Sequence, residues 1–287
     1  MDIRSILVVI DGGTHSELSL EVAISMGKFF TAHVEVLHVQ AHTHVVASSF
    51  AGSDPIVVPS EYLQEQIAER ASHAEKMFQV HCVDAGVTVL DVDEEHSEQS
   101  QTTVTWRKVI GHEDQEIARL GRVSDLIVMA FPDKQSGGVD ASALETALFD
   151  TGKPVMVFNE TFSEFSGDTI TIAWDGSREA AHSVGLAIPF LKRATTIRIL
   201  TVIDPENDNN PNELTRFLAF HGLHAEFYAR VKGERSIAEV LMDEAEGWKS
   251  SLVVMGAYGH HLVWESLVGG VTRDVLAKSK VPVFLAH

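Results

Sequence analysis

The chain contains an internal repeat, and this repeat constrains the fold more than any other feature of the sequence. Four landmarks recur in the same order in both halves. They are Ile6–Ile10 with Thr169–Trp174, Asp11–Gly13 with Asp175–Ser177, Ser124–Ala130 with Ser250–Gly256, and Lys153–Phe158 with Val281–Leu285. Most of these segments are apolar runs of strand length, so the repeat indicates a duplicated domain.

Within each half, short apolar runs alternate with segments of helical spacing. In the first half this pattern predicts helices over Ser16–Phe30, Glu61–Val80, Asp114–Leu120 and Ala141–Phe149. Continuous apolar strands that alternate with helices are typical of a parallel sheet covered on both faces. We therefore expect an α/β fold of two tandem, doubly wound domains, each an open five-stranded parallel sheet flanked by helices.

The polar stretch Asn159–Asp168 separates the repeats. It divides the chain into an N-terminal domain over residues 1–160 and a C-terminal domain over residues 168–287. At roughly 100–200 residues per domain, two domains suit a chain of 287 residues. The first half is longer because it carries an additional segment, His42–Ser60, that we expect to form a loop.

The charge balance limits the partners of the chain. It has 22 basic and 41 acidic residues and a formal net charge of −19, which disfavours nucleic acid and anionic membranes as partners. No apolar run reaches the length of a membrane span or of a signal peptide. The single cysteine, Cys82, excludes an intrachain disulfide and fits a reducing compartment, so we expect a cytoplasmic protein with an inert thiol.

Glycines gather between the apolar run that ends at Met255 and a predicted helix that begins at Val271. They are Gly256, Gly259, Gly269 and Gly270. In an open parallel sheet, ligands bind beyond the carboxyl ends of the strands, where the strand order reverses. The N-terminus of a helix offers N–H groups and partial positive charge, and glycines let an anion approach closely. This stretch therefore favours a nucleotide site that faces Asp175.

The spacing Gly256-x2-Gly259-x9-Gly269, followed by Gly270-Val-Thr272, resembles the ATP-binding motif of the universal stress protein family, over nearly the whole chain in a tandem form. The resemblance implies an adenine nucleotide α-hydrolase-like fold and ATP, with or without Mg²⁺, as the ligand. It implies Asp175 beside the ribose, the Val202 backbone beside the adenine, and the phosphates on the glycine-rich stretch. The expected binding residues are Asp175, Val202, Met255, Gly256, Gly259, Gly269, Gly270, Val271 and Thr272. Gly270 departs from the family, which has Ser or Thr there, so a hydroxyl contact is lost unless Thr272 replaces it.

The corresponding stretch of the first half departs further from this motif. Ala130 replaces the first glycine, Pro132 has no N–H group, and Asp133 would repel phosphate. Asp11 is retained, and Gly137-Gly138 follow. We expect this site to be degenerate, and therefore at most one nucleotide per chain.

Other chemistries lack their sequence patterns. The chain has no Gly-x4-Gly-Lys-[Ser/Thr], no Gly-x-Gly-x-x-Gly and no His-Glu-x-x-His. The fifteen histidines are interpreted as surface or loop residues, and Ser177 as a helix cap. No catalytic or metal-binding residue is assigned, although slow ATP hydrolysis is compatible with the resemblance. Two alternatives to a regulatory ATP-binding protein stay open: a pseudo-symmetric interaction scaffold without nucleotide, and a hydrolase of adenylyl substrates.

The last strand of each half is expected to lie at a sheet edge. These strands are Pro154–Phe158 and Pro282–Ala286. Exposed apolar edges tend to be paired or covered. In the family this strand forms the dimer contact, so we expect the two halves to pair there as an intrachain pseudo-dimer. A homodimer through another surface is a further possibility.

Overall fold

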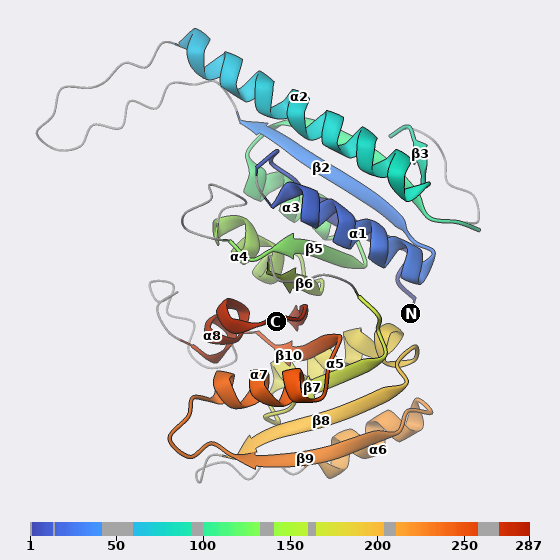
Figure 1. The fold of residues 1–287 in the computed structure, drawn as a ribbon, viewed down its shortest axis with the longest axis vertical. Coiled ribbons are helices and arrows are strands. Elements are labelled where there is room, and N and C mark those ends of the chain that lie inside the picture. The colour runs from blue at the N-terminus through green and yellow to red at the C-terminus, as the bar shows by residue number, and fades with distance from the viewer. Residues whose placement is uncertain are drawn as a thin grey trace, which may run out of the picture.

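Figure 1 shows the fold in a computed structural model, which describes residues 2–13, 15–41, 60–92, 100–132, 141–159, 165–203, 211–257 and 270–287. The first half contains β1 (Ser5–Val9), α1 (Ser16–Phe30), β2 (His33–Ala41), α2 (Ser60–Ala85), β3 (Thr88–Leu90), β4 (Thr103–Gly111), α3 (Glu113–Gly121), β5 (Leu126–Ala130), α4 (Ala141–Phe149) and β6 (Val155–Phe158). The second half contains β7 (Thr169–Ala173), α5 (Arg178–Leu191), β8 (Thr196–Ile203), α6 (Asn212–Phe220), β9 (Ala225–Val231), α7 (Ile237–Gly247), β10 (Leu252–Gly256), α8 (Val271–Lys278) and β11 (Val283–Ala286).

The strands form one 11-stranded sheet in the order β3-β4-β2-β1-β5-β6-β11-β10-β7-β8-β9. Neighbouring strands are parallel within each half, as the buried apolar runs predicted. The halves meet where β6 and β11 pair antiparallel, with Phe284 opposite Met156. The tandem, doubly wound fold and the intrachain pseudo-dimer are therefore confirmed. The first half adds the short edge strand β3 to the expected five strands.

Two apolar cores cover the two faces of this sheet. The first contains side chains of α1, α2, α5 and α6, such as Leu20, Phe78, Val184 and Leu218. The second contains side chains of α3, α4, α7 and α8. Each core draws residues from both halves, so the two repeats share their apolar interior.

Aromatic rings join the halves on the α1/α5 face. Phe30 of α1 and Phe190 of α5 meet edge to face with ring centroids 4.7 Å apart. Phe190 also contacts Phe284 of β11 at 5.5 Å. The Arg193 guanidinium lies 4.7 Å from the Phe30 ring centroid. Aromatic pairs of this geometry add to the free energy of apolar burial, so the junction stabilises both halves.

Two features of the first half refine the sequence predictions. Helix α2 is longer than expected, because it begins at Ser60 and continues to Ala85. The loop expected over His42–Ser60 lies outside the described residues except for Ser60. Cys82 is buried in α2, and burial raises the pKa of its thiol to about 11, as an inert thiol requires. Among the described residues, no helix combines the length and apolar character needed to cross a bilayer.

Candidate functional site

The strand order of the second half reverses between β7 and β10. Strand β7 pairs with β8 on one side and with β10 on the other. Helix α5, which follows β7, packs on one face of the sheet, and α8, which follows β10, packs on the other. Helices that leave on opposite faces open a crevice at the carboxyl edge of the sheet, where ligands bind in folds of this type.

A tight turn follows β7 at this edge. Asp175 Oδ1 accepts hydrogen bonds from Ser177 N at 2.9 Å and from Ser177 Oγ at 2.6 Å. Ser177 Oγ in turn accepts from Ala180 N at 3.1 Å and caps α5, as predicted. Gly176 has φ +75°, a conformation that favours glycine. Asp175 is exposed, and Oδ2 makes no hydrogen bond to any described residue, so this oxygen is available to a ligand.

Gly256 ends β10 against the start of α5. A Cβ built at Gly256 would lie 2.6 Å from Ala180 N and 2.7 Å from the carbonyl carbon of Glu179. Contacts this short with backbone atoms leave no space for a side chain. The glycine is therefore required by the packing of strand against helix, independently of any ligand.

Met255 is also held by protein contacts. Its side chain is buried in the core, and its carbonyl accepts from Ser183 Oγ at 2.8 Å. Ser183 also donates to the carbonyl of Ala286 at 3.3 Å and accepts from its N–H at 3.0 Å. This buried serine ties α5 to the ends of β10 and β11. The sequence analysis did not identify it, although Ser19 occupies the same place in the first repeat.

Helix α8 begins at the same edge because the helix of a β-α-β unit runs opposite to its strands. Gly270, its N-cap, is exposed and extended, with φ 171° and open space around its Cα. Val271 is 38% exposed, whereas Thr272 is buried at 6%. The first intrahelical bond joins Asp274 N to Gly270 O at 3.1 Å. In any α-helix the N–H groups of the first turn have no acceptor within the helix itself, so acceptors outside the helix must serve them.

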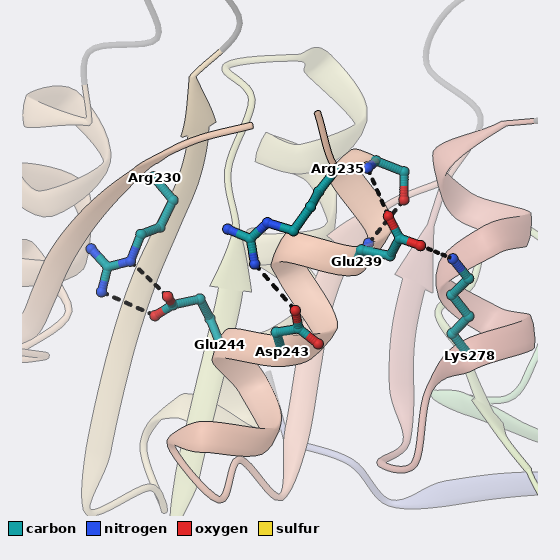
Figure 2. A network of polar contacts seen from close by, with 7 residues as sticks. Arg230, Arg235, Glu239, Asp243, Glu244 and Lys278 are labelled. Carbon is teal, nitrogen blue, oxygen red and sulfur yellow. Dashed lines mark hydrogen bonds and ion pairs between the residues drawn. The ribbon is translucent and has the colours of Figure 1, made fainter. Parts of the chain in front are cut away.

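A polar network fixes α8 against α7, as Figure 2 shows. Ser236 and Glu239 form a capping box at the start of α7, and Glu239 Oε1 accepts from Lys278 Nζ of α8 at 3.0 Å. The hydrogen bond from Ser236 N, followed by the contact with Lys278, lowers the pKa of Glu239 to about 2. From the first half, Asn159 Nδ2 donates to the carbonyls of Leu276 and Ser279 at 2.7 and 2.8 Å. Both ends of the last turn of α8 are thus anchored.

Val202 lies in β8 beyond the end of β7. The last pair between these strands is Ala173 with Leu200, and Leu200 O accepts from Trp174 N at 2.9 Å. Backbone groups along a strand point alternately to its two neighbours, so Val202 presents its N–H and C=O on the side of Leu200. The Val202 backbone therefore faces the space above β7, next to the Asp175 turn.

A buried carboxylate that the sequence analysis missed lies at this edge. Glu179 is 6% exposed, directly against Gly256. A hydrogen bond from its own backbone N–H, and then the Arg178 guanidinium, lower its pKa. Glu179 Oε1 lies 2.8 Å from Arg178 Nη2. The ion pair offsets a negative charge that would otherwise oppose an anionic ligand nearby.

The first half has the equivalent turn after β1, but α2 lies over it. Asp11 Oδ1 accepts from Gly13 N at 2.8 Å, as Asp175 does from Ser177 N. However, α2 crosses this turn: a Cβ on Gly12 would lie 2.8 Å from Arg70 O, and His73 Nδ1 contacts Gly12 O at 3.3 Å. In the second half, the nine-residue α6 takes the place of the 26-residue α2.

The strand ends of the two halves also correspond. Phe131 N donates to Phe158 O at 2.8 Å, and Ala257 N donates to Ala286 O at 2.9 Å, so Ala130 occupies the place of Gly256. The structure thus brings Asp175, Gly256 and the Val202 backbone to one edge and starts α8 there. Gly259 and Gly269, with Asp133, Gly137 and Gly138 of the first half, lie outside the described residues.

Comparison with known proteins identifies relatives of both halves. The sequence model of the universal stress protein family matches residues 2–149 and again residues 167–287. A universal stress protein structure from Archaeoglobus fulgidus aligns with a TM-score of 0.68 and 18% identity, covering 98% of this chain and 97% of that one. A functionally unknown protein from Pseudomonas aeruginosa aligns with a TM-score of 0.52 and 17% identity, covering 99% and 92%. At these identities the structural likeness shows the fold alone. No curated protein matches the chain.

Proposed function

Because the chain belongs to the universal stress protein family, in a tandem two-domain form, we propose that it binds one adenine nucleotide, ATP, in its C-terminal domain. We place this domain at residues 168–287 and the N-terminal domain at residues 1–160. The expected ATP contacts are Asp175, Val202, Met255, Gly256, Gly259, Gly269, Gly270, Val271 and Thr272.

The observation that carries this proposal is the contrast between the two carboxyl edges. The turn at Asp11 lies under α2, with Arg70 O against Gly12. The equivalent turn at Asp175 is exposed, and a much shorter helix, α6, follows β8. Only the second edge combines an exposed carboxylate with the family glycine spacing.

Each part of the edge suits one part of the nucleotide. Asp175 Oδ2 can accept from a ribose hydroxyl, and the Val202 N–H and C=O can pair with the edge of the adenine. The phosphates would meet the N-terminus of α8 at Gly270 and Val271, where partial positive charge favours an anion. Met255 and Gly256 contribute by shaping the strand end, since both are held by protein contacts.

We infer a regulatory binding role rather than turnover. Phosphoryl transfer needs a group that positions the attacking water and groups that neutralise charge on the phosphates. The charged side chains described near the edge include the carboxylates of Asp175, Glu179 and Asp274, with Arg178 paired to Glu179 and Arg273 in the first turn of α8. No sequence motif places a water-activating group among them. A nucleotide-free scaffold or an adenylyl-substrate hydrolase would replace this proposal if ATP fails to bind or is consumed.

A matched pair of variants tests the assignment. Nucleotide released from the purified, denatured protein is identified by mass spectrometry, and ATP affinity is then measured for Asp175→Ala and Asp11→Ala. Each substitution removes one backbone and one hydroxyl hydrogen bond to the aspartate, but only Asp175→Ala removes the ribose partner. A hydrogen bond to a charged group contributes about 1.5–3 kcal/mol, so we expect Asp175→Ala to weaken ATP binding about tenfold or more. Equal effects of the two substitutions would overturn the assignment.

A further inference from the structure

Three potential metal ligands converge between α1 and α2 of the first half, away from the candidate nucleotide site. Glu17 and Glu21 are four residues apart on α1 and therefore share one face of the helix. His81 reaches them from α2. His81 Nε2 lies 3.3 Å from Glu17 Oε1 and 3.6 Å from Glu21 Oε1, and all three ligand atoms lie within 4.8 Å of one another.

The two helices hold these side chains in register. They run side by side in the same direction, since Gly12 before α1 meets Arg70, and Lys28 Nζ near the end of α1 donates to Ala85 O at 2.7 Å. His81 is largely enclosed, with 15% of its side chain exposed, whereas the side chains of Glu17 and Glu21 are 63% and 57% exposed. The cluster therefore combines one largely buried imidazole with two carboxylates that solvent can reach.

The orientation of the imidazole is fixed by its other nitrogen. His81 Nδ1 lies 2.9 Å from Met77 O, and a carbonyl oxygen can only accept, so Nδ1 donates. In the neutral ring Nε2 then carries a lone pair, which faces two carboxylate oxygens. Histidine ligands of metals commonly donate their second N–H to a backbone carbonyl in this way. Three converging electron-pair donors repel one another unless a proton, a metal ion or water lies between them.

The distances favour a metal ion. Charge-assisted N–H···O hydrogen bonds are about 2.7–2.9 Å long, and both contacts of Nε2 are longer, at 3.3 and 3.6 Å. A tetrahedral ion with bonds of about 2.0–2.2 Å separates its ligand atoms by roughly 3.3–3.6 Å. The two distances from Nε2 match this separation.

We propose that Glu17, Glu21 and His81 form a binding site for a divalent first-row transition ion, with Zn²⁺ as the reference case. One imidazole and two carboxylates suit such ions, whereas Ca²⁺ and Mg²⁺ favour oxygen ligands alone. The exposed carboxylates leave a fourth position to water. The ion would pin α2 onto α1 and so stabilise the helix that covers the Asp11 turn. Sequence spacing could not identify this site, because its ligands come from helices about sixty residues apart.

The test is a titration of the full chain with Zn²⁺ at pH 7.5, in competition with a chromophoric chelator. We expect one Zn²⁺ ion to bind at this site with higher affinity than at any other histidine of the chain. Loss of a supporting hydrogen bond already costs metal sites about 10–100-fold, so loss of the direct ligand in His81→Gln should weaken the site at least about tenfold. The control is His73→Gln, an exposed histidine on the same helix, which should bind Zn²⁺ like the unchanged protein.

Glu21→Gln provides the second variant, because this exposed side chain can lose its charge without disturbing the core. It should weaken Zn²⁺ binding as His81→Gln does, and crystals grown with Zn²⁺ should show an anomalous peak between α1 and α2. Unchanged affinity in both variants, no tight site in the unchanged protein, or a peak only at other histidines would overturn the proposal.

Discussion

The first and second halves share one turn and one strand order but treat the carboxyl edge of the sheet differently. Asp11 and Asp175 each accept a hydrogen bond from the backbone N–H two residues further on. In the first half, α2 lies over the turn, and Ala130 ends β5. In the second half, Gly256 lets β10 approach α5, and the Asp175 turn is exposed. A duplicated domain can thus keep its local turn while a longer helix partly covers it.

Closure of the first edge also uses a buried histidine. His38 Nδ1 contacts Ile10 O at 2.9 Å, and its ring stacks on Trp106 with centroids 5.8 Å apart. The same place in the second half is held by Thr201, whose buried Oγ1 has no hydrogen-bond partner among the described residues. At this position the first half therefore has an aromatic ring, whereas the second half has a small side chain.

The largest expected effect concerns the glycines of the second half. Gly259→Glu and Gly269→Glu would place a carboxylate against phosphate, and like-charge contacts of this kind cost several kcal/mol. We expect ATP affinity to fall at least about 100-fold in a folded protein, as measured by calorimetry. The matched substitution in the first half, Gly138→Glu, should leave ATP affinity unchanged. Unchanged affinity in the first two variants would refute the phosphate assignment.

The junction between the halves should respond next most strongly. Phe190→Ala removes a fully buried ring that contacts Phe30 and Phe284. Such substitutions cost about 3–5 kcal/mol, and we expect both halves to lose stability together in denaturant unfolding. Phe220→Ala, at a ring that is 76% exposed, should cost less than about 1 kcal/mol. Separate unfolding of one half in Phe190→Ala would argue against a shared core.

Swapping the residues that end β5 and β10, alanine for glycine and glycine for alanine, tests the difference between the two carboxyl edges. Gly256→Ala places a Cβ 2.6 Å from Ala180 N, so we expect a loss of about 1–3 kcal/mol in unfolding free energy. Ala130→Gly should cost about 0.5–1 kcal/mol and create no second ATP site, because α2 still covers the turn. A second site in Ala130→Gly would show that α2 does not close the first edge.

The smallest effect is a dependence on pH that belongs to the first half. Burial lowers the pKa of His38 from 6.5, so the unfolded chain binds more protons than the folded chain just below that pH. Stability should therefore fall as pH decreases below 6.5. His38→Asn, which can still donate to Ile10 O, should flatten this slope in denaturant titrations, whereas the exposed His224→Asn should not. An unchanged slope in His38→Asn would assign the dependence to other groups.

The sequence predicted those features that depend on local pattern. The alternation of strands and helices, the Asp175 turn and the cap at Ser177 follow from apolar runs and turn residues, and the structure bears out the fold and the cap. Other features depend on residues far apart in the chain. Examples are Arg70 over Gly12, Glu179 beneath Gly256, and His81 between Glu17 and Glu21. No spacing rule connects these residues, because only the packing of α1, α2 and α5 brings them together.

The most direct test is the number of ATP molecules bound per chain. Calorimetric titration of the 287-residue chain should give one site, which disappears in Gly269→Glu and persists in Gly138→Glu. One site follows if α2 closes the edge of the first half while the edge of the second half admits the nucleotide. Two equivalent sites, or a single site that survives in Gly269→Glu and is lost in Gly138→Glu, would contradict the assignment of nucleotide binding to the second half.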